Sequence, residues 1–255
     1  MTIEESVVMA MDGTDIELYP YLSYILQDIW EIGSDPDVII KVIKNHFTSY
    51  SDLKLLDLGC GKGAVSIKIA KELGCHCYGI DALSDFINYA NQKAIEFNVG
   101  NLCKFEIADI RKKVNYLFDY DIILLGSIGP VFGDLFTTIT RVSKCLNRNG
   151  IIIIDEGYID NSSSFTHPLI MNKRLIDEQI EMAGMVLVTE YIADTNDIKE
   201  TDDFIFDNLI RRCNELIDMY PDKTQIFNNY IKNQVLENDV LENKIVCSTM
   251  VIKYK

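Results

Sequence analysis

The stretch that most constrains this chain is residues 55–63, which read Leu-Leu-Asp-Leu-Gly-Cys-Gly-Lys-Gly. The first four residues are typical of a buried strand, and three glycines follow at alternate positions, Gly59, Gly61 and Gly63. Glycine loses more conformational entropy on folding than other residues, so this density indicates a tight turn that a bound group approaches closely. A strand, a glycine turn and a helix point backbone N–H groups at such a group. We therefore predict a nucleoside-containing cofactor here.

Two classes of cofactor fit such a turn, dinucleotides and S-adenosylmethionine. Gly59, Gly61 and Ala64 satisfy the dinucleotide fingerprint G-x-G-x-x-A, which is a weak signal when it stands alone. Asp57, however, comes directly before the turn and would repel a diphosphate. A carboxylate at this position suits a cofactor that carries an ammonium and a sulfonium group.

Two further acids end the neighbouring strands that the sequence predicts. Asp81 ends the second strand, 18 residues after Gly63, where a carboxylate can accept both ribose hydroxyls of either cofactor. Asp109 ends the third strand and can accept a hydrogen bond from an adenine amino group. Together with Asp57, these acids favour S-adenosylmethionine over a dinucleotide.

Strand and helix patterns alternate through the middle of the chain. The predicted strands are 54–58, 76–80, 103–108, 121–126 and 151–156, and the predicted helices are about 63–73, 84–97, 133–146 and 168–183. The unbroken isoleucine run at 151–154 is typical of a strand buried on both faces. Regular alternation predicts an α/β fold with a parallel sheet covered by helices on both sides.

The two ends of the chain follow other patterns. Residues 1–15 are interpreted as a loose start, and helices are predicted over 21–30 and from Ser34 or Asp35 to Phe47. Sixth and seventh strands are predicted at 185–193 and 245–254, with helices at 206–220 and 224–236 between them. We therefore divide the chain into a helical lid (1–50), a Rossmann-like core (51–193 and 241–255) and an embedded helical cap (194–240).

Taken together, these motifs resemble those of the class I S-adenosylmethionine-dependent methyltransferases. LLDLGCGKG, YGID and FEIADI match the first, second and adenine-side motifs of that family, and FDYDIILLGSIG matches its fourth strand and following loop. CLNRNGIIIIDEGYI resembles the turn into the fifth strand, although residues 147–150 lack its proline and first glycine, and MAGMVLVTEYI resembles the entry to the sixth. The layout is similar to that of the small-molecule methyltransferases related to ubiquinone and menaquinone biosynthesis.

The resemblance implies a seven-stranded, mostly parallel Rossmann-like sheet whose last strand is antiparallel and lies between the fifth and sixth. It also implies roles for residues that match the motifs. Asp57, Gly59, Cys60 and Gly61 would meet the methionine end of the cofactor, and Asp81 with Ala82 would hold the ribose. Asp109 and Ile110 would frame the adenine, and Gly126 and Ser127 would line the methyl path. Gly63, also in the turn, is expected to pack the helix against the strand. Two of these residues have simpler alternative roles: Asp109 could cap a turn, and Ser127 could serve only in packing.

The methyl acceptor is not identified by these motifs. Glu156 and Tyr158 follow the fifth strand and are candidate acceptor-side groups, and His167 is the candidate base among three histidines. Each has a simpler reading, since a carboxylate or histidine in this loop can cap a helix or turn. The expected activity is methyl transfer to a small molecule by in-line displacement. The alternatives are a protein-directed methyltransferase, a non-catalytic S-adenosylmethionine-binding module and a dehydrogenase.

Charge and cysteine content limit the remaining possibilities. The 24 basic and 39 acidic residues give a net charge of −15, which disfavours nucleic acid and anionic membrane surfaces as partners. The seven cysteines form no CxxC pair and are interpreted as reduced thiols of a cytoplasmic protein. Cys75, His76 and Cys77 alternate between strand faces, so no metal site is expected. The absence of a leader-like start or a long apolar run agrees with this interpretation, and a monomer or homodimer is expected.

Overall fold

The computed structural model describes all 255 residues, and its central element is one seven-stranded sheet. The strands are β1 (Lys54–Leu58), β2 (His76–Asp81), β3 (Cys103–Ile107), β4 (Tyr120–Gly126), β5 (Leu146–Tyr158), β6 (Met185–Ile192) and β7 (Val246–Tyr254). The α-helices are α1 (Ile3–Ala10), α2 (Leu22–Ile25), α3 (Pro36–His46), α4 (Ala64–Leu73), α5 (Ser84–Glu96), α6 (Ile110–Lys113), α7 (Leu135–Val142), α8 (Lys173–Met182), α9 (Thr195–Met219) and α10 (Thr224–Asn243). Short 3₁₀ helices lie at Ile16–Tyr21, Val114–Tyr116, Ser143–Cys145 and Pro221–Lys223.

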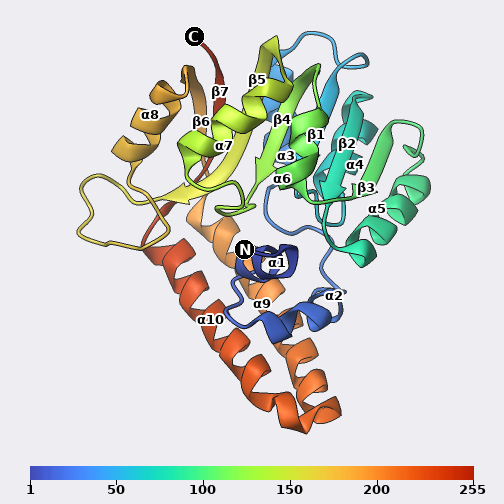
Figure 1. The fold of residues 1–255 in the computed structure, drawn as a ribbon, viewed down its shortest axis with the longest axis vertical. Coiled ribbons are helices and arrows are strands. Elements are labelled where there is room, and N and C mark those ends of the chain that lie inside the picture. Colours follow the sequence, from blue (N-terminus) through green and yellow to red (C-terminus); the bar gives the residue numbers. More distant parts are fainter.

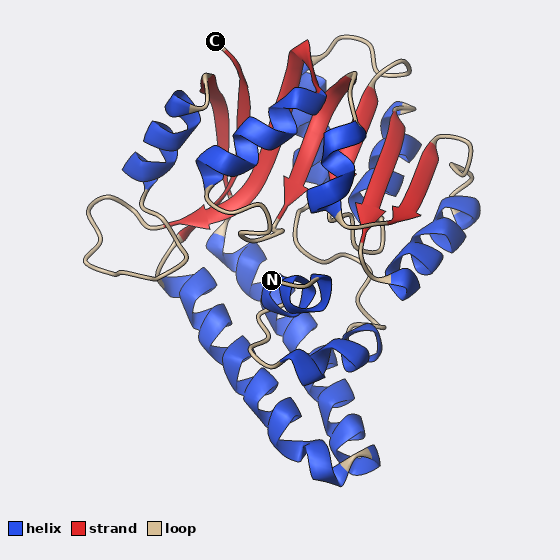
Figure 2. Cartoon of the chain, viewed as in Figure 1, coloured by secondary structure: helices blue, strands red, loops and turns tan.

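The strand order is β3-β2-β1-β4-β5-β7-β6, and only β7 runs against the others. This order confirms the predicted fold, including the insertion of the last strand between the fifth and sixth (Figure 2). Because all parallel strands end at the same edge, the acids and glycines that follow β1 to β5 are gathered there.

Two hydrophobic cores hold helices against the faces of the sheet. On one face, side chains of α3, α4 and α5 pack with the inward residues of the strands, including Leu55, Ile122 and Ile153. On the other face, side chains of α6, α7 and α8 pack with the alternate residues, including Leu56 and Ile152. The isoleucine run contributes to both cores, as expected for a strand buried on both sides.

A third core lies below the carboxyl ends of the strands and joins the two chain segments expected to form the lid and cap. It contains buried residues of α1, α2, α9 and α10 together with Leu83 and Phe86 at the start of α5. Figure 1 shows α1 below the carboxyl ends of the strands, where it overlies the upper part of α9 in this view. In contrast, α3 packs on the sheet, so the expected lid of residues 1–50 is divided between two cores.

Three local predictions differ from the structure. Residues 1–15, expected to be loose, include α1, whose capping box joins the Thr2 hydroxyl to the Glu5 N–H and the Glu5 carboxylate to the Thr2 N–H. The single helix expected over 21–30 is instead a 3₁₀ turn that leads into the four-residue α2. The turn expected at 147–150 is part of β5, which begins at Leu146 with a register irregularity against β4.

All seven cysteines are free, and Cys75 and Cys77 are buried whereas His76 between them is exposed. None of the helices combines the length and the apolar composition needed to cross a bilayer.

Candidate active site

The glycine turn connects β1 to α4 and is fastened to the end of β2. The N–H groups of Gly59 and Cys60 donate to the Ile80 carbonyl at 2.8 and 3.1 Å. The backbone of Gly59 and Gly61 is left-handed, with φ of 79° and 52°. A Cβ on Gly59 would lie 2.6 Å from the Ile128 side chain, whereas a Cβ on Gly61 would meet nothing within 4 Å. Gly61 is therefore the point at which bare backbone borders open space.

Gly63 and Cys60 have their side-chain positions turned into the protein. A Cβ on Gly63 would lie 2.7 Å from the Phe105 ring and 2.9 Å from the Ala90 Cβ, which agrees with the packing role expected for this glycine. The Cys60 thiol lies against Gly79, because a Cβ there would approach its sulfur to 2.8 Å. Cys60 can thus offer a ligand only its backbone.

The two predicted carboxylates beside the turn come together in the structure. Asp81 accepts the Gly61 N–H on one oxygen and the Leu83 N–H on the other, both at 2.9 Å. Burial raises the pKa of Asp81, and these backbone bonds partly offset the rise. Asp57 accepts the Ser66 hydroxyl at 2.7 Å; burial raises its pKa to about 7, the Ser66 bond lowers it, and the charge of Asp81 raises it further. Two acids that resist ionisation therefore line the turn, and Ala82, half-buried, follows Asp81.

Asp109 is brought beside Asp81, because the Ala108 N–H donates to the Asp81 carbonyl at 2.9 Å. Its carboxylate caps α6 through the Arg111 N–H and also pairs with the Arg111 guanidinium at 2.9 and 3.1 Å. Burial acts to raise the pKa of Asp109, but the Arg111 bonds outweigh it and the pKa is lowered. The capping role is thus observed, and Ile110 next to it is buried. Whether Asp109 also receives an adenine stays a prediction.

Gly126 at the end of β4 and Ser127 just after it pack against the segment that precedes α3. A Cβ on Gly126 would lie 2.5 Å from the Ser34 hydroxyl, so this glycine is needed for close packing. Ser127 has a left-handed φ of 54°, and its N–H donates to the Asp155 carbonyl at 3.0 Å. Ser127 itself is exposed at the carboxyl edge of the sheet.

The three candidate acceptor-side residues occupy different environments. Glu156 as a whole residue is exposed to solvent, but protein atoms surround its carboxyl group. This desolvation, followed by the charge of Asp155, raises the pKa of Glu156. Tyr158 is buried, with the Lys173 ammonium 5.8 Å from its ring, a position that favours packing. His167 is half-exposed in the loop after β5, where its Nδ1 accepts the Leu169 N–H at 3.3 Å and its ring stacks on Phe165. Of the three, Glu156 is best placed to exchange a proton.

The N-terminal segment covers this edge of the sheet. The Arg111 guanidinium donates to the Met1 carbonyl at 3.1 Å, which anchors the start of α1 near the end of β3. Burial, followed by the charges of Glu4 and Asp81, raises the pKa of Tyr19. Tyr19 packs in the third core with Val8 of α1, and we call this part of the N-terminal segment the roof.

Lys62 lies inside the glycine turn, and the sequence patterns predicted no role for it. The residue is 4% exposed, and its ammonium donates to three backbone carbonyls of residues 26–29. The only signal in the sequence was a charged residue between two glycines, which gave no indication of a partner more than 30 positions away.

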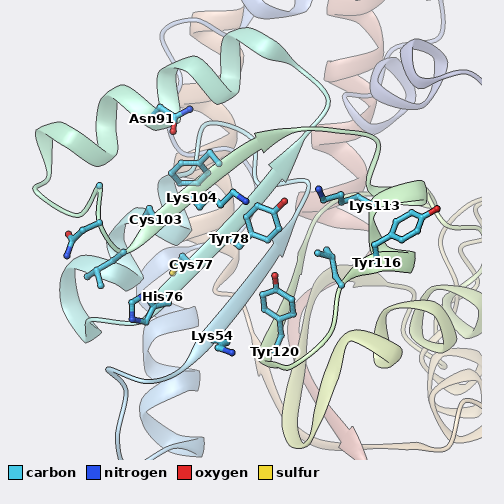
Figure 3. Close-up of a pocket in the computed structure, with 15 residues that line it drawn as sticks. Lys54, His76, Cys77, Tyr78, Asn91, Cys103, Lys104, Lys113, Tyr116 and Tyr120 are labelled. Atoms are coloured by element: carbon cyan, nitrogen blue, oxygen red, sulfur yellow. The ribbon is translucent and has the colours of Figure 1, made fainter.

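A cavity with a volume of about 930 Å³ lies elsewhere, at the opposite edge of the sheet. Its side chains come from the first residues of β1 to β4 and from the segment after α6 (Figure 3). They include Lys54, His76, Lys104, Lys113 and Tyr120. No residue of the glycine turn lines this groove.

The site and the fold agree with a methyltransferase domain. A family model described as a methyltransferase domain matches residues 49–200, which is more than half of the chain. The chain belongs to this family of methyltransferase domains. The matched segment begins before β1 and ends within α9, so it includes the glycine turn and six of the seven strands.

Among curated proteins, the ubiquinone biosynthesis O-methyltransferase of Rickettsia bellii is 35% identical over 117 residues, which cover 46% of this chain and 47% of that protein. The ribosomal protein L11 methyltransferase of Thermosipho melanesiensis is 36% identical over 129 residues, which cover 49% of this chain and 46% of that protein. The chain therefore spans about half the length of the curated relatives it matches.

Solved structures extend the likeness to nearly the whole fold. A SAM-dependent methyltransferase from Geobacter sulfurreducens, solved with S-adenosyl-L-homocysteine, matches with a TM-score of 0.74 at 15% identity, covering 92% of this chain and 98% of that one. The [4+2]-cyclase SpnF matches with a TM-score of 0.71 at 14% identity, covering 99% of this chain and 97% of that one. At such identities the likeness concerns the fold alone.

Proposed function

We propose that this protein transfers the methyl group of S-adenosylmethionine to a small-molecule acceptor and releases S-adenosylhomocysteine. The observation that carries the proposal is Gly61, whose backbone borders open space while its N–H is held by Asp81. Family membership, the S-adenosylhomocysteine in the Geobacter structure and the name of the Rickettsia relative support the same function.

The residues present fit a cationic adenosine derivative better than a dinucleotide. Asp57 and Asp81 flank the turn, and burial raises the pKa of both; a cationic ligand would stabilise their ionised forms, whereas a diphosphate would destabilise them. In the proposed complex, Asp57, Gly59 and Gly61 hold the methionine end, Asp81 and Ala82 the ribose, and Ile110 the adenine. Gly126 and Ser127 lie along the methyl path. When bound, the cofactor supplies an electrophilic methyl group on a sulfonium.

The chain itself positions the acceptor, excludes water and accepts a proton where the acceptor must lose one. In the proposed complex, the roof formed by Tyr19 and α1, which lies at the carboxyl ends of the strands, would limit the access of water. Glu156 is the candidate base, because its raised pKa makes its carboxylate a stronger proton acceptor than an ordinary glutamate. His167 and Tyr158 remain alternatives whose positions favour them less.

Calorimetry with S-adenosylmethionine, S-adenosylhomocysteine and a nicotinamide dinucleotide tests the donor. We expect both adenosyl compounds to bind at micromolar to submillimolar concentrations and the dinucleotide not to bind. Failure of both adenosyl compounds to bind at millimolar concentration would refute the proposal. Binding of the dinucleotide would instead favour the dehydrogenase reading of the glycine turn.

A second candidate, a protein-directed methyltransferase, is favoured by the Thermosipho relative, whose name specifies a ribosomal protein. Incubation with cofactor tritiated on the methyl group and a cell extract separates the two candidates. A small-molecule acceptor leaves the label in the acid-soluble fraction, and a protein acceptor leaves it in the precipitate. Cofactor binding without label in either fraction would favour a non-catalytic binding module.

The cellular setting is also part of the proposal. Seven free thiols support a reducing compartment such as the cytoplasm. The net charge of −15 supports an acceptor other than nucleic acid. We expect the protein to act as a monomer or homodimer.

A further inference from the structure

Lys62 extends from the glycine turn into the lid and is bound there on every side. Its ammonium donates to the carbonyls of Leu26, Ile29 and Gln27 at 2.5, 2.7 and 3.1 Å, all just after α2. In return, the Trp30 indole N–H donates to the Lys62 carbonyl at 3.1 Å. The turn and residues 26–30 are therefore joined by four hydrogen bonds in both directions.

An ammonium in this position is costly to bury, and the surroundings are arranged to receive it. The rings of Phe86 and Tyr89 on α5 lie 5.3 and 5.1 Å from Nζ. Burial lowers the pKa of Lys62 to about 8, and the charge of Asp28 opposes this change. Lys62 is thus still charged at neutral pH. An apolar side chain packed in the same place would avoid the cost of burying this charge.

The contacts continue from the lid into the cap. Asp28 accepts Nε and Nη2 of Arg212 on α9 at 2.5 and 2.9 Å, and Nη2 of the neighbouring Arg211 at 2.9 Å. Arg212 also donates to Glu215 at 2.8 Å, and Glu215 accepts the Tyr24 hydroxyl at 2.7 Å. A continuous polar chain therefore runs from the glycine turn through residues 26–29 to α9.

We propose that Lys62 is a positioning residue that couples the glycine turn to the lid and cap. By holding residues 26–29 against the turn, it keeps Gly61 in the conformation that receives the cofactor and fixes the roof over the acceptor. The expected effect of Lys62 on cofactor binding rests on the proposed function. The coupling between the turn and the lid is independent of that function.

The first test compares Lys62→Met with Lys68→Met. Lys68 is a matched control, because its ammonium also lies over the Trp30 ring, at 5.9 Å, and contacts the lid residue Glu31 but no lid carbonyl. We expect Lys62→Met to weaken S-adenosylhomocysteine binding by tenfold or more and Lys68→Met to change it by less than twofold. Equal binding in the two variants would overturn the proposal.

The second test uses amide hydrogen exchange of the free protein and therefore needs no ligand. We expect Lys62→Met to accelerate exchange in residues 26–30 and in α9, with no such change in Lys68→Met. Unchanged exchange would refute the coupling itself. If the wild-type protein binds no adenosyl compound, the proposed function fails while this experiment still decides the coupling.

The third test is a pH profile with Lys62→Arg as the conservative variant. A neutral amine has two N–H donors for three carbonyls, so we expect wild-type affinity for S-adenosylhomocysteine to fall as the pH rises through about 8. An arginine remains charged, so Lys62→Arg should retain affinity and lack this fall. Trp30, the only tryptophan, reports the same transition by its fluorescence. A wild-type profile identical to that of Lys62→Arg would exclude titration of Lys62. If Lys62→Met does not fold, Asp28→Asn tests instead the contact between residues 26–29 and α9.

Discussion

The carboxyl and amino ends of the same sheet provide two different environments. At the carboxyl end, Asp57 is the penultimate residue of β1, Asp81 ends β2, and Asp109 comes just after β3; Asp81 binds the backbone of the glycine turn. At the amino end, Lys54 and His76 begin β1 and β2 and line the cavity of about 930 Å³. The glycine turn and its acids lie at the carboxyl end, and none of them lines the cavity at the amino end. The presence of a cavity is therefore a poorer guide to this site than the backbone geometry, because open α/β sheets bind ligands where parallel strands lead into helices.

The largest expected effect comes from Gly61→Ala. Its Cβ would occupy the open space beside the turn, so we expect S-adenosylhomocysteine affinity to fall at least about 100-fold, or roughly 2.7 kcal/mol. Gly74→Ala is the matched control, since Gly74 has a similar φ of 74° and a Cβ there also meets nothing within 4 Å. Both variants should lose about 1 kcal/mol of stability from the left-handed backbone, but only Gly61→Ala should lose binding in calorimetry. Equal affinities of the two variants for S-adenosylhomocysteine would show that the cofactor binds away from the glycine turn.

Asp81→Ala should weaken S-adenosylhomocysteine binding by about 1–3 kcal/mol, the scale for hydrogen bonds to a charged group. The loss has two sources, because Asp81 also holds the Gly61 N–H at 2.9 Å. Asp85→Ala, an exposed position in the first turn of α5, serves as the control in the same titration. Unchanged affinity in Asp81→Ala would remove the ribose assignment.

Asp57→Asn should change the pH dependence of stability. Burial raises the pKa of Asp57 to about 7, so between pH 5 and 7 the folded state holds a proton that the unfolded state has released. Stability from this group is present at low pH and is lost as the pH rises through about 7. Urea unfolding should therefore show the wild type losing about 1–2 kcal/mol more than the variant between pH 5 and 7. Parallel curves would contradict the buried, protonated state of Asp57.

The smallest effect is expected in the groove at the amino end. Lys104 is 72% exposed in its side chain and lies far along β3 from the turn, so Lys104→Ala should leave S-adenosylhomocysteine affinity within about twofold. Tyr120→Phe, at the first residue of β4, should behave in the same way. A loss as large as that of Asp81→Ala would end the distinction between the two ends of the sheet.

The fold could be predicted in detail where its signals are local. The glycine turn, the isoleucine run and the alternation of strands and helices are each determined by residues close in sequence, and β1 matches its predicted bounds. The antiparallel β7 followed from the resemblance rather than from its residues. The helix α1 was missed although Thr2 and Glu5 form a capping box, because a helix of eight residues is too short to show a clear apolar repeat.

The site was less predictable because its contacts are distant in sequence. The three carbonyls that Lys62 binds lie 33 to 36 positions away, and no local pattern indicates them. Likewise, α9 begins at Thr195, well before the predicted start, since Asp194 caps it and its first turns are polar. The acids beside the turn were foreseen, but the pairing of Asp109 with Arg111 depends on side-chain geometry.

The helix pair α9–α10 leaves and rejoins the sheet at one point, because the Ala193 N–H donates to the Cys247 carbonyl at 3.0 Å. The strands β6 and β7 are antiparallel neighbours, a pair that two or three residues suffice to connect. The excursion is therefore an insertion into a strand pair that a short turn could close. Its buried residues Leu209, Cys213 and Phe227 nevertheless complete the third core together with α1 and α2. Removing the helix pair would thus expose the apolar side of the N-terminal helices as well, so the first and last thirds of the chain have to fold together.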